Sequence, residues 1–407
     1  MFSVNKLLPS IVMSSLLLSA ATVADDNFRF TGYARFGAAY TDDDPLYRNS
    51  IRNGINVIKT AGSQYALTGH LANQAMGIEI GFEKKWKANG SNWRALFMAT
   101  DNYNSDPWRS AQAWAGGDNV IKSNPSAMPW AGQRYAQRVQ MLLNNYKPLQ
   151  NDGTGGGIDN IDLGFGKLSV SAISGLTKNG WATDSNGRYA LMTSLKGVRI
   201  TDGHTLDFFA NYGFGDSRDH FNGNGEKFDY DEDAYQLGVL YNNNRKDGWT
   251  KYMVRYGRGV KENIVRNVVA EDGGSLGLFV YGQERLSPKF SIMYALSHEH
   301  NDMSTNRDGE TEKWSQAVFR GGYYYTTHIS TWLEAAYDYI DFYDGNNSSW
   351  KLTLSQNFSL GNHLMSRPIV HFYVSTGGLD TEVVANSGAK LGTADALSVG
   401  TYFEVFL

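Results

Sequence analysis

The sequence predicts an all-β fold: a transmembrane antiparallel β-barrel around an aqueous pore. Apolar and polar residues alternate in roughly seventeen segments, a pattern that puts one face of each strand in lipid and the other in water. Aromatic residues make up 13% of the chain, which has 44 glycines but only 8 prolines. Beyond residue 24 no apolar run reaches the length of a membrane helix, which excludes a helical membrane protein.

Residues 1–24 resemble a secretory signal peptide, so we expect the barrel domain to span 25–407. Lys6 gives a positive start, Leu7 to Leu18 is mostly apolar, and Thr22-Val23-Ala24 supplies small residues for cleavage. A membrane anchor is the alternative, but the segment is short and no stop-transfer flank follows it.

The first expected strand covers 28–40. Its even positions, such as Phe30, Phe36 and Tyr40, are apolar or aromatic, whereas Tyr33 and Arg35 occupy odd positions. Because side chains alternate along a strand, Tyr33 and Arg35 are predicted to face the lumen.

The same alternation recurs to the end of the chain. Apolar positions of one parity stand opposite polar ones in segments 76–85, 93–99, 168–172, 206–214, 290–297, 333–339, 350–358, 370–374 and 398–407. The parity of the last segment points Phe406 inward.

A bacterial single-chain barrel needs an even number of strands, so sixteen or eighteen is expected. A barrel of that width leaves an aqueous channel, and closure removes exposed strand edges. A large soluble β-sandwich or a propeller is the alternative, but no propeller repeat is present.

Charge and motif content exclude other classes. The formal net charge is −4, or −5 without residues 1–24, which carry one lysine and no acid; this argues against a nucleic-acid binder. There is no cysteine, so no disulfide framework supports the fold. No Gly-x-Ser-x-Gly motif or Ser/His/Asp grouping indicates catalysis, so we expect no enzyme.

Four motifs carry a family resemblance. They are Gly32-Tyr-Ala-Arg35, Trp130-Ala-Gly-Gln-Arg-Tyr-Ala-Gln-Arg138, Asp159-Asn-Ile-Asp-Leu-Gly-Phe-Gly-Lys-Leu-Ser169 and Ser366-Arg-Pro368. In this order and spacing the chain resembles the maltoporin (LamB-type) family of carbohydrate-specific outer-membrane porins. The resemblance implies eighteen strands, a homotrimer in the outer membrane of a Gram-negative bacterium, and sugar diffusion along an aromatic track beside a polar track. It also implies contacts with outer-membrane lipid and lipopolysaccharide, and delivery to a periplasmic sugar-binding protein.

An aromatic ring offers flat apolar surface to the C–H face of a sugar, and polar groups beside it bond the hydroxyls. The resemblance assigns the aromatic track to five residues, namely Tyr33, Tyr103, Tyr146, Trp314 and Phe406. Any of these tyrosines could instead belong to an interfacial girdle. The parity of Trp314 is not settled by its neighbours, so it could face lumen or lipid.

The polar track and constriction are assigned in the same way to Arg35, Arg109, Arg138, Gln140 and Asn145. The constricting loop is expected at about 136–157, and Asp106-Pro-Trp-Arg109 resembles a loop that reaches into a neighbouring subunit. The three arginines could instead be ordinary pore-wall charges.

Departures from the family pattern qualify the substrate. Met76 and Leu237 stand where the family has track aromatics, and Thr68 stands near a track arginine. We therefore expect a channel for a different or smaller oligosaccharide than the longer maltodextrins; a general diffusion porin without a saturable sugar site is the alternative.

No cofactor is expected. The acidic segments Asp42–Asp44 and Asp229–Asp233 could hold Ca²⁺, but neither has the spacing of a calcium loop.

Overall fold

The computed structural model describes residues 27–43, 51–52, 55–56, 58–62, 66–73, 76–101, 108–175, 188–215, 220–221, 227–228, 233–265, 273–302, 311–384 and 391–407. The expected signal segment 1–24, Tyr103, Asp44 of the first acidic segment and residues 229–232 of the second lie outside these residues. In the described part, no helix is long and apolar enough to cross a membrane.

Eighteen antiparallel strands close into one barrel, as predicted, and sixteen is wrong. Strand bounds are β1 Phe28–Asp43, β4 Gly77–Ala88, β5 Ser91–Asp101, β6 Arg109–Asp118, β7 Met128–Val139, β8 Leu149–Asp162, β9 Lys167–Ser174, β10 Arg188–Thr201, β11 His204–Gly215, β14 Ala234–Arg245, β15 Gly248–Arg258, β16 Gly274–Ser287, β17 Phe290–Asp302, β18 Thr311–Tyr324, β19 Ile329–Phe342, β20 Gly345–Ser359, β21 Ile369–Thr381 and β22 Gly392–Phe406. Two small hairpins lie outside the barrel sheet, β2 Ile51–Arg52 with β3 Ile55–Asn56, and β12 His220–Phe221 with β13 Lys227–Phe228.

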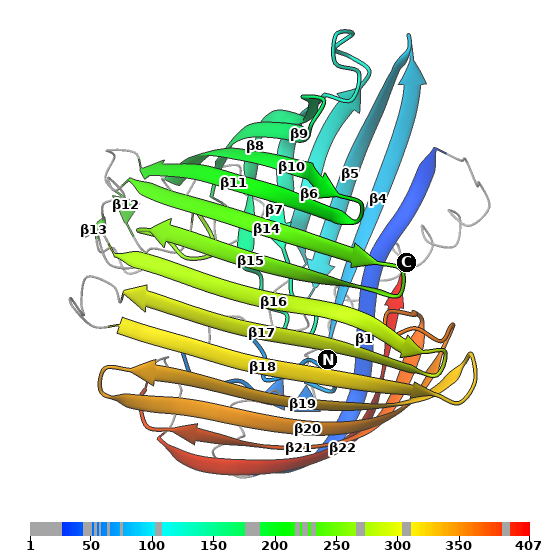
Figure 1. The fold of residues 1–407 in the computed structure, drawn as a ribbon, viewed down its shortest axis with the longest axis vertical. Coiled ribbons are helices and arrows are strands. Elements are labelled where there is room, and N and C mark those ends of the chain that lie inside the picture. The colour runs from blue at the N-terminus through cyan, green and yellow to red at the C-terminus, as the bar shows by residue number, and fades with distance from the viewer. Residues whose placement is uncertain are drawn as a thin grey trace, which may run out of the picture.

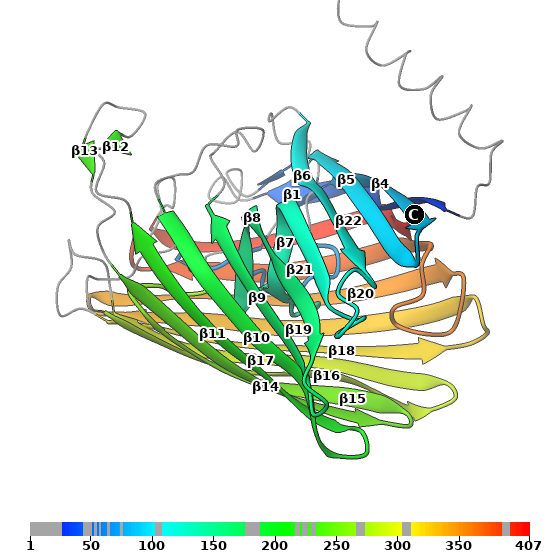
Figure 2. The same ribbon diagram turned by 90° about the horizontal axis from the view of Figure 1, so that it is seen from above.

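Strand neighbours in space follow the chain, and β1 closes the barrel by pairing with β22 on one side and β4 on the other. Figure 1 shows β14 to β19 side by side across one wall, and Figure 2, turned by 90°, shows β1 next to β22 and β4. Most strands are joined by tight turns at one end and by longer connections at the other, as in outer-membrane barrels.

The predicted alternation separates two environments. On β19, Leu333 and Tyr337 are 50% and 51% exposed on the outer face, while the residue after each of them, Glu334 and Asp338, is fully buried on the lumen side. Exposed large apolar side chains continue in this way over β14 to β22. The outer surface is thus apolar and the inner one polar.

Inside the barrel, three segments of the described chain fold onto the inner wall: residues 58–62 with 66–73, residues 140–148 and residues 259–265, which we call the first, second and third lumen loops. Leu71 and Met141 pack with Trp332 and Trp314 of the wall, and Ile264 packs with Met192 on another side. The core of the molecule therefore lies between the lumen loops and the inner wall.

The second lumen loop is the tip of a hairpin that leaves the wall over most of the predicted range of 136–157. β7 pairs with β6 only over Trp130–Gln133, and β8 pairs with β9 only from Thr154 onward, so residues 134–153 lack both wall neighbours. Gln137 and Asn151 of this inward hairpin bond instead to residues of β10, β11 and β14. Arg138 and Asp152, expected in the loop, are paired strand residues at its base, with Arg138 Nη2 donating to Asp152 Oδ2 at 2.5 Å. The ladder between β7 and β8 satisfies backbone groups that an extended loop would leave unbonded.

Candidate functional site

One row of side chains crosses five adjacent strands on the lumen face. The strand register aligns Phe406 with Tyr33, Tyr33 with Glu79, Glu79 with Thr100 and Thr100 with Arg109. We call this set the wall row. Because directly paired residues point to the same face of a sheet, the register brings Phe406, Tyr33 and Arg109 together although they are far apart in the sequence.

An aromatic pair forms the centre of the wall row. The rings of Tyr33 and Phe406 lie 5.5 Å apart, and Phe406 is 54% exposed, so its face is open to a solute. Phe36 and Phe403, one parity away, stack on the outer face of the same two strands. The period-two prediction for both track residues agrees with this arrangement.

Arg35 lies beside this pair, as predicted. Its Nη1 donates to the hydroxyl of Tyr33 at 3.0 Å, and its backbone pairs with Glu404. Glu404 in turn accepts from Arg367 Nε at 2.5 Å. An aromatic face therefore adjoins fixed donors and acceptors, which is the combination that a sugar ring needs.

The constriction cluster, which we define as Tyr135, Arg138, Asp152 and Lys147, lies in the inward hairpin at the base of the second lumen loop. Asp152 accepts two hydrogen bonds from Arg138 Nε and one from its Nη2, and the Arg138 guanidinium lies 3.2 Å from the centre of the Tyr135 ring. Burial lowers the pKa of Lys147, the charge of Arg138 lowers it further, and Asp152, Glu79 and Glu262 oppose the shift. Glu79 thus links this cluster electrostatically to the wall row.

Gln140 and Asn145 lie on the same lumen loop. Gln140 Nε2 donates to Asn145 Oδ1 at 2.9 Å, and both side chains remain partly or fully exposed. Asn145 adopts φ of +60°, a left-handed conformation that asparagine tolerates better than most residues. Two amide groups are therefore available to sugar hydroxyls at this loop.

Two predicted track aromatics are placed differently. Trp314 faces the lumen side, which settles its orientation, but it is only 3% exposed and its indole N–H donates to Asp338. Tyr146 is equally buried, lies 4.8 Å from Trp314 between ring centres, and donates to Glu299. Both rings hold the second lumen loop against the wall and are covered by it.

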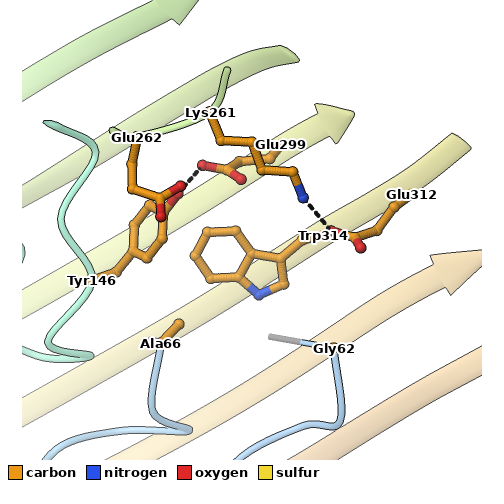
Figure 3. A pocket seen from close by; sticks show the side chains of 8 residues that line it. All are labelled: Gly62, Ala66, Tyr146, Lys261, Glu262, Glu299, Glu312 and Trp314. Carbon is orange, nitrogen blue, oxygen red and sulfur yellow. Dashed lines mark hydrogen bonds and ion pairs between the residues drawn. The ribbon is translucent and has the colours of Figure 1, made fainter. Parts of the chain in front are cut away.

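Figure 3 shows this buried region. Trp314 and Tyr146 line a small cavity with Ala66, Lys261 and three carboxylates, those of Glu262, Glu299 and Glu312. Lys261 bonds Glu312 at 3.3 Å, and Arg255 bonds Glu299 at 2.9 Å. Within the described residues, no group of three or more acidic or histidine side chains has a geometry that could hold a metal ion.

The structure also explains two departures from the family pattern, at Leu237 and Thr68. Leu237 is 52% exposed on the outer face, so it does not continue the track. Thr68 is fully buried in the first lumen loop, where its hydroxyl bonds Ser349 at 2.5 Å. Arg109 is an exposed residue at the start of β6, and Tyr103 falls outside the described residues.

Sequence reasoning missed Glu79 and the first and third lumen loops. Glu79 could have been found from its odd position on β4, which it shares with the polar residues Glu83 and Lys85. Nothing in the local sequence marks residues 58–73 or 259–265 as inward-folded, because their partners lie on strands far away in the chain.

Comparison with known proteins gives the following. A family model described as LamB porin matches residues 28–406. Among solved structures, the outer membrane channel DcaP of Acinetobacter baumannii is 11% identical, with a TM-score of 0.53 over 93% of this chain and 97% of that one. Acinetobacter baumannii OccAB1 is 8% identical, with a TM-score of 0.51 over 94% and 97%. Pseudomonas aeruginosa OccK8 (OprE) is 11% identical, with a TM-score of 0.50 over 94% and 99%.

Proposed function

Because this chain belongs to the LamB porin family, we propose that it is a channel for facilitated diffusion of sugars, most of all short oligosaccharides. Family membership makes it a porin, an outer-membrane channel of a Gram-negative bacterium. We infer that it has no enzymatic activity. The sugar specificity is our inference.

The observation that carries the proposal is the Tyr33–Phe406 pair with Arg35 beside it. Two adjacent rings, one of them half exposed, and a guanidinium bonded to the tyrosine hydroxyl form a compact sugar-sized surface on the lumen wall. Such a site binds weakly, as conduction requires, because a solute must leave as readily as it enters.

The buried Trp314 and Tyr146 and the outward Leu237 support a preference for short sugars. Among the described residues of the predicted track, only Tyr33 and Phe406 form an adjacent aromatic pair that a solute can reach. A long maltodextrin gains from rings in series, whereas one pair suits one or two sugar units. The same shortage of rings favours the general diffusion porin as the second candidate.

The test is sugar-induced block of ion current in planar bilayers, with mono-, di- and trisaccharides and maltohexaose as solutes. We expect saturable block by a short saccharide. Tyr33→Ala should raise its dissociation constant about three- to tenfold, since one ring contact contributes about 0.5–1.5 kcal/mol. Tyr40→Ala is the matched control, because Tyr40 is a 75% exposed residue of the other parity on the same strand.

Two results would count against the proposal. Absence of saturable block by every saccharide would favour the general diffusion porin. Micromolar block by maltohexaose would contradict the preference for short sugars while leaving a sugar site in place.

We also propose a homotrimer that meets its neighbours through β5 to β9. The register aligns Ala95, Ala115, Ala131, Gly156 and Ala172 in one row across these five strands. Ala115, Ala131 and Ala172 are exposed on the outer face. A wall of small side chains is flat and lets another barrel approach closely, in contrast to the bulky outer face of β14 to β22. Delivery to a periplasmic sugar-binding protein and contact with lipopolysaccharide belong to the same proposal.

A further inference from the structure

Several cations in the lumen lie over aromatic rings. In the half of the barrel nearer the tight turns, Arg94 lies 5.7 Å from the ring centre of Trp114. Lys196 lies 5.6 Å from Phe209, and Lys251 lies 5.6 Å from Trp249. The three pairs are contributed by strands from β5 round to β15, so cation and ring recur side by side along this part of the channel wall.

Strand parity puts these cations on the lumen face. Trp93 and Tyr252, next to Arg94 and Lys251, are 42% and 43% exposed on the outer face. Lys196 shares parity with Met192, which is 1% exposed and packs in the inner core, whereas Leu191 on the other face is 51% exposed.

Aromatic rings hold these three cations in place, but no ion pair within the described residues neutralises their charge. Arg94, Lys196 and Lys251 make no ion pair with any residue that the structure describes, in contrast to Arg134, which pairs with Asp159 at 2.7 Å. An aromatic face attracts a cation through its quadrupole while the net charge persists. Asp207 is the acid that acts on Lys251, and its oxygens already accept from Gly197 N and Asn242 Nδ2.

The constriction adds further unpaired positive charge to the lumen. Lys147 and Arg109 also make no ion pair within the described part of the chain, and Arg138 is neutralised by Asp152. Besides Asp152, Glu79 and Glu262 are the acids that act on Lys147. Five cations of the lumen, namely Arg94, Lys196, Lys251, Lys147 and Arg109, thus make no ion pair within the described residues. Rings of Arg and Lys in a pore favour anions.

We propose that the saccharide carried by this channel bears an anionic group, a carboxylate or a sulfate ester. This assignment rests on the proposed sugar channel and specifies its substrate class. The sugar ring stacks on the partly exposed face of Trp249, while its acid group meets Lys251 beside that ring or Lys196 of β10. At the wall row, the Tyr33–Phe406 pair receives the ring and Lys147 and Arg109 attract the charge.

The experiment compares maltotriose with trigalacturonate, which have the same number of sugar units and differ in charge. Trigalacturonate should block the current with a dissociation constant about tenfold or more below that of maltotriose, since one unscreened charge contact exceeds that difference. A KCl gradient across the same bilayer should give a reversal potential of the sign for chloride preference. Lys196→Gln with Lys251→Gln should reduce both effects several-fold.

Lys313→Gln is the control. Lys313 lies on the outer face, with its side chain 48% exposed and 3.9 Å from Asp341. The substitution therefore removes one positive charge outside the lumen, and it should change neither the sugar block nor the reversal potential. Equal or tighter block by maltotriose, or preference for potassium, would overturn the anionic assignment and leave the sugar channel standing. Block by neither sugar would overturn the sugar channel itself, and the assignment with it.

Discussion

Leu237 is 52% exposed on the outer face of β14, and its neighbour Gln236 is fully buried on the lumen side. One position along a strand thus separates a residue that meets lipid from one that bonds the lumen loops, since Gln236 Nε2 donates to Lys261 O at 2.8 Å. An alignment that matches Leu237 to a lumen aromatic assigns it to the wrong face.

Leu237→Phe should therefore leave sugar block unchanged, although it restores the aromatic residue of the family pattern. A phenylalanine there would extend outward beside Tyr235 and Val239, which are also exposed on the outer face. The dissociation constant of the best blocking sugar, measured in bilayers, should stay within about twofold of the wild type, as expected for a surface change. A clear gain in affinity would show that this strand turns Leu237 toward the solute.

Lys147 gives a pH prediction. Its pKa lies below the ordinary lysine value because burial and Arg138 disfavour the charged form. As pH rises, Lys147 loses its proton before exposed lysines do, so the constriction loses positive charge at a lower pH than the exposed lysines titrate. Chloride preference, measured from reversal potentials, should fall there in the wild type.

The control variant is Lys147→Arg, which stays charged throughout this range. It should retain chloride preference over the pH interval in which the wild type loses it. Identical pH profiles for the two proteins would assign the change to another group.

The lumen-facing parity of single residues could be predicted from sequence, and their accessibility could not. Period-two alternation places Tyr33, Arg35 and Phe406 inward. Trp314 shares the inward face, yet Tyr146 and the second lumen loop cover it. Covering depends on contacts between distant segments, which no local pattern contains.

Among the elements, the first lumen loop is held to the wall by hydrogen bonds to a buried ion cluster. Leu71 N donates to Glu334 Oε1 at 2.9 Å, and Lys351 Nζ donates to Leu71 O at 2.7 Å. Gly69, at φ of +71°, lies so close to the wall that a Cβ atom would meet Glu334 Oε1 at 2.5 Å. The loop backbone therefore docks directly on a buried ion cluster that also contains Arg320.

Glu334→Gln should release this loop. The neutral amide leaves Lys351 and Arg320 buried without their anion, and breaking a buried ion pair costs about 3–5 kcal/mol. We expect a larger single-channel conductance and faster proteolytic cleavage within residues 58–73. Both are measured on the folded, membrane-reconstituted protein.

Glu284→Gln is the matched control, because Glu284 pairs with Arg245 at 2.6 Å in a partly exposed position at the barrel rim. It should leave conductance and cleavage unchanged. If Glu334→Gln also leaves them unchanged, the loop is held by its other contacts, such as the hydrogen bond from Gln316 Nε2 to Leu67 O at 3.0 Å.

The strands could be predicted because alternation is local, but the lumen loops could not. Residues 58–73 dock on β18 to β20, more than 240 positions along the chain, as in the Gln316–Leu67 bond. The inward hairpin is placed at about 136–157 by the family resemblance, because its arms, rich in Gln, Asn and Gly, lack the apolar alternation that marks the other strands. Those arms pair with each other and with neither β6 nor β9, so neither of their faces meets lipid.

For the whole molecule, the row of small residues on β5 to β9 predicts how copies associate. Ala115→Trp should place a bulky ring on the flat face and shift the protein toward monomers, detected on unheated SDS gels and by native mass. Leu352→Trp is the control, since Leu352 is 42% exposed among the bulky apolar residues of β20. Trimers that persist in Ala115→Trp would place the contact on another face.

Closure of the barrel has a consequence for the order of assembly. Tyr33 belongs to β1 and Phe406 to β22, strands near opposite ends of the sequence that are neighbours only across the closing seam. Contacts between residues so distant in the chain form late, because the intervening strands must be positioned first. The aromatic pair is therefore completed when β22 pairs with β1. The proposed sugar-binding surface forms in the same step that closes the barrel.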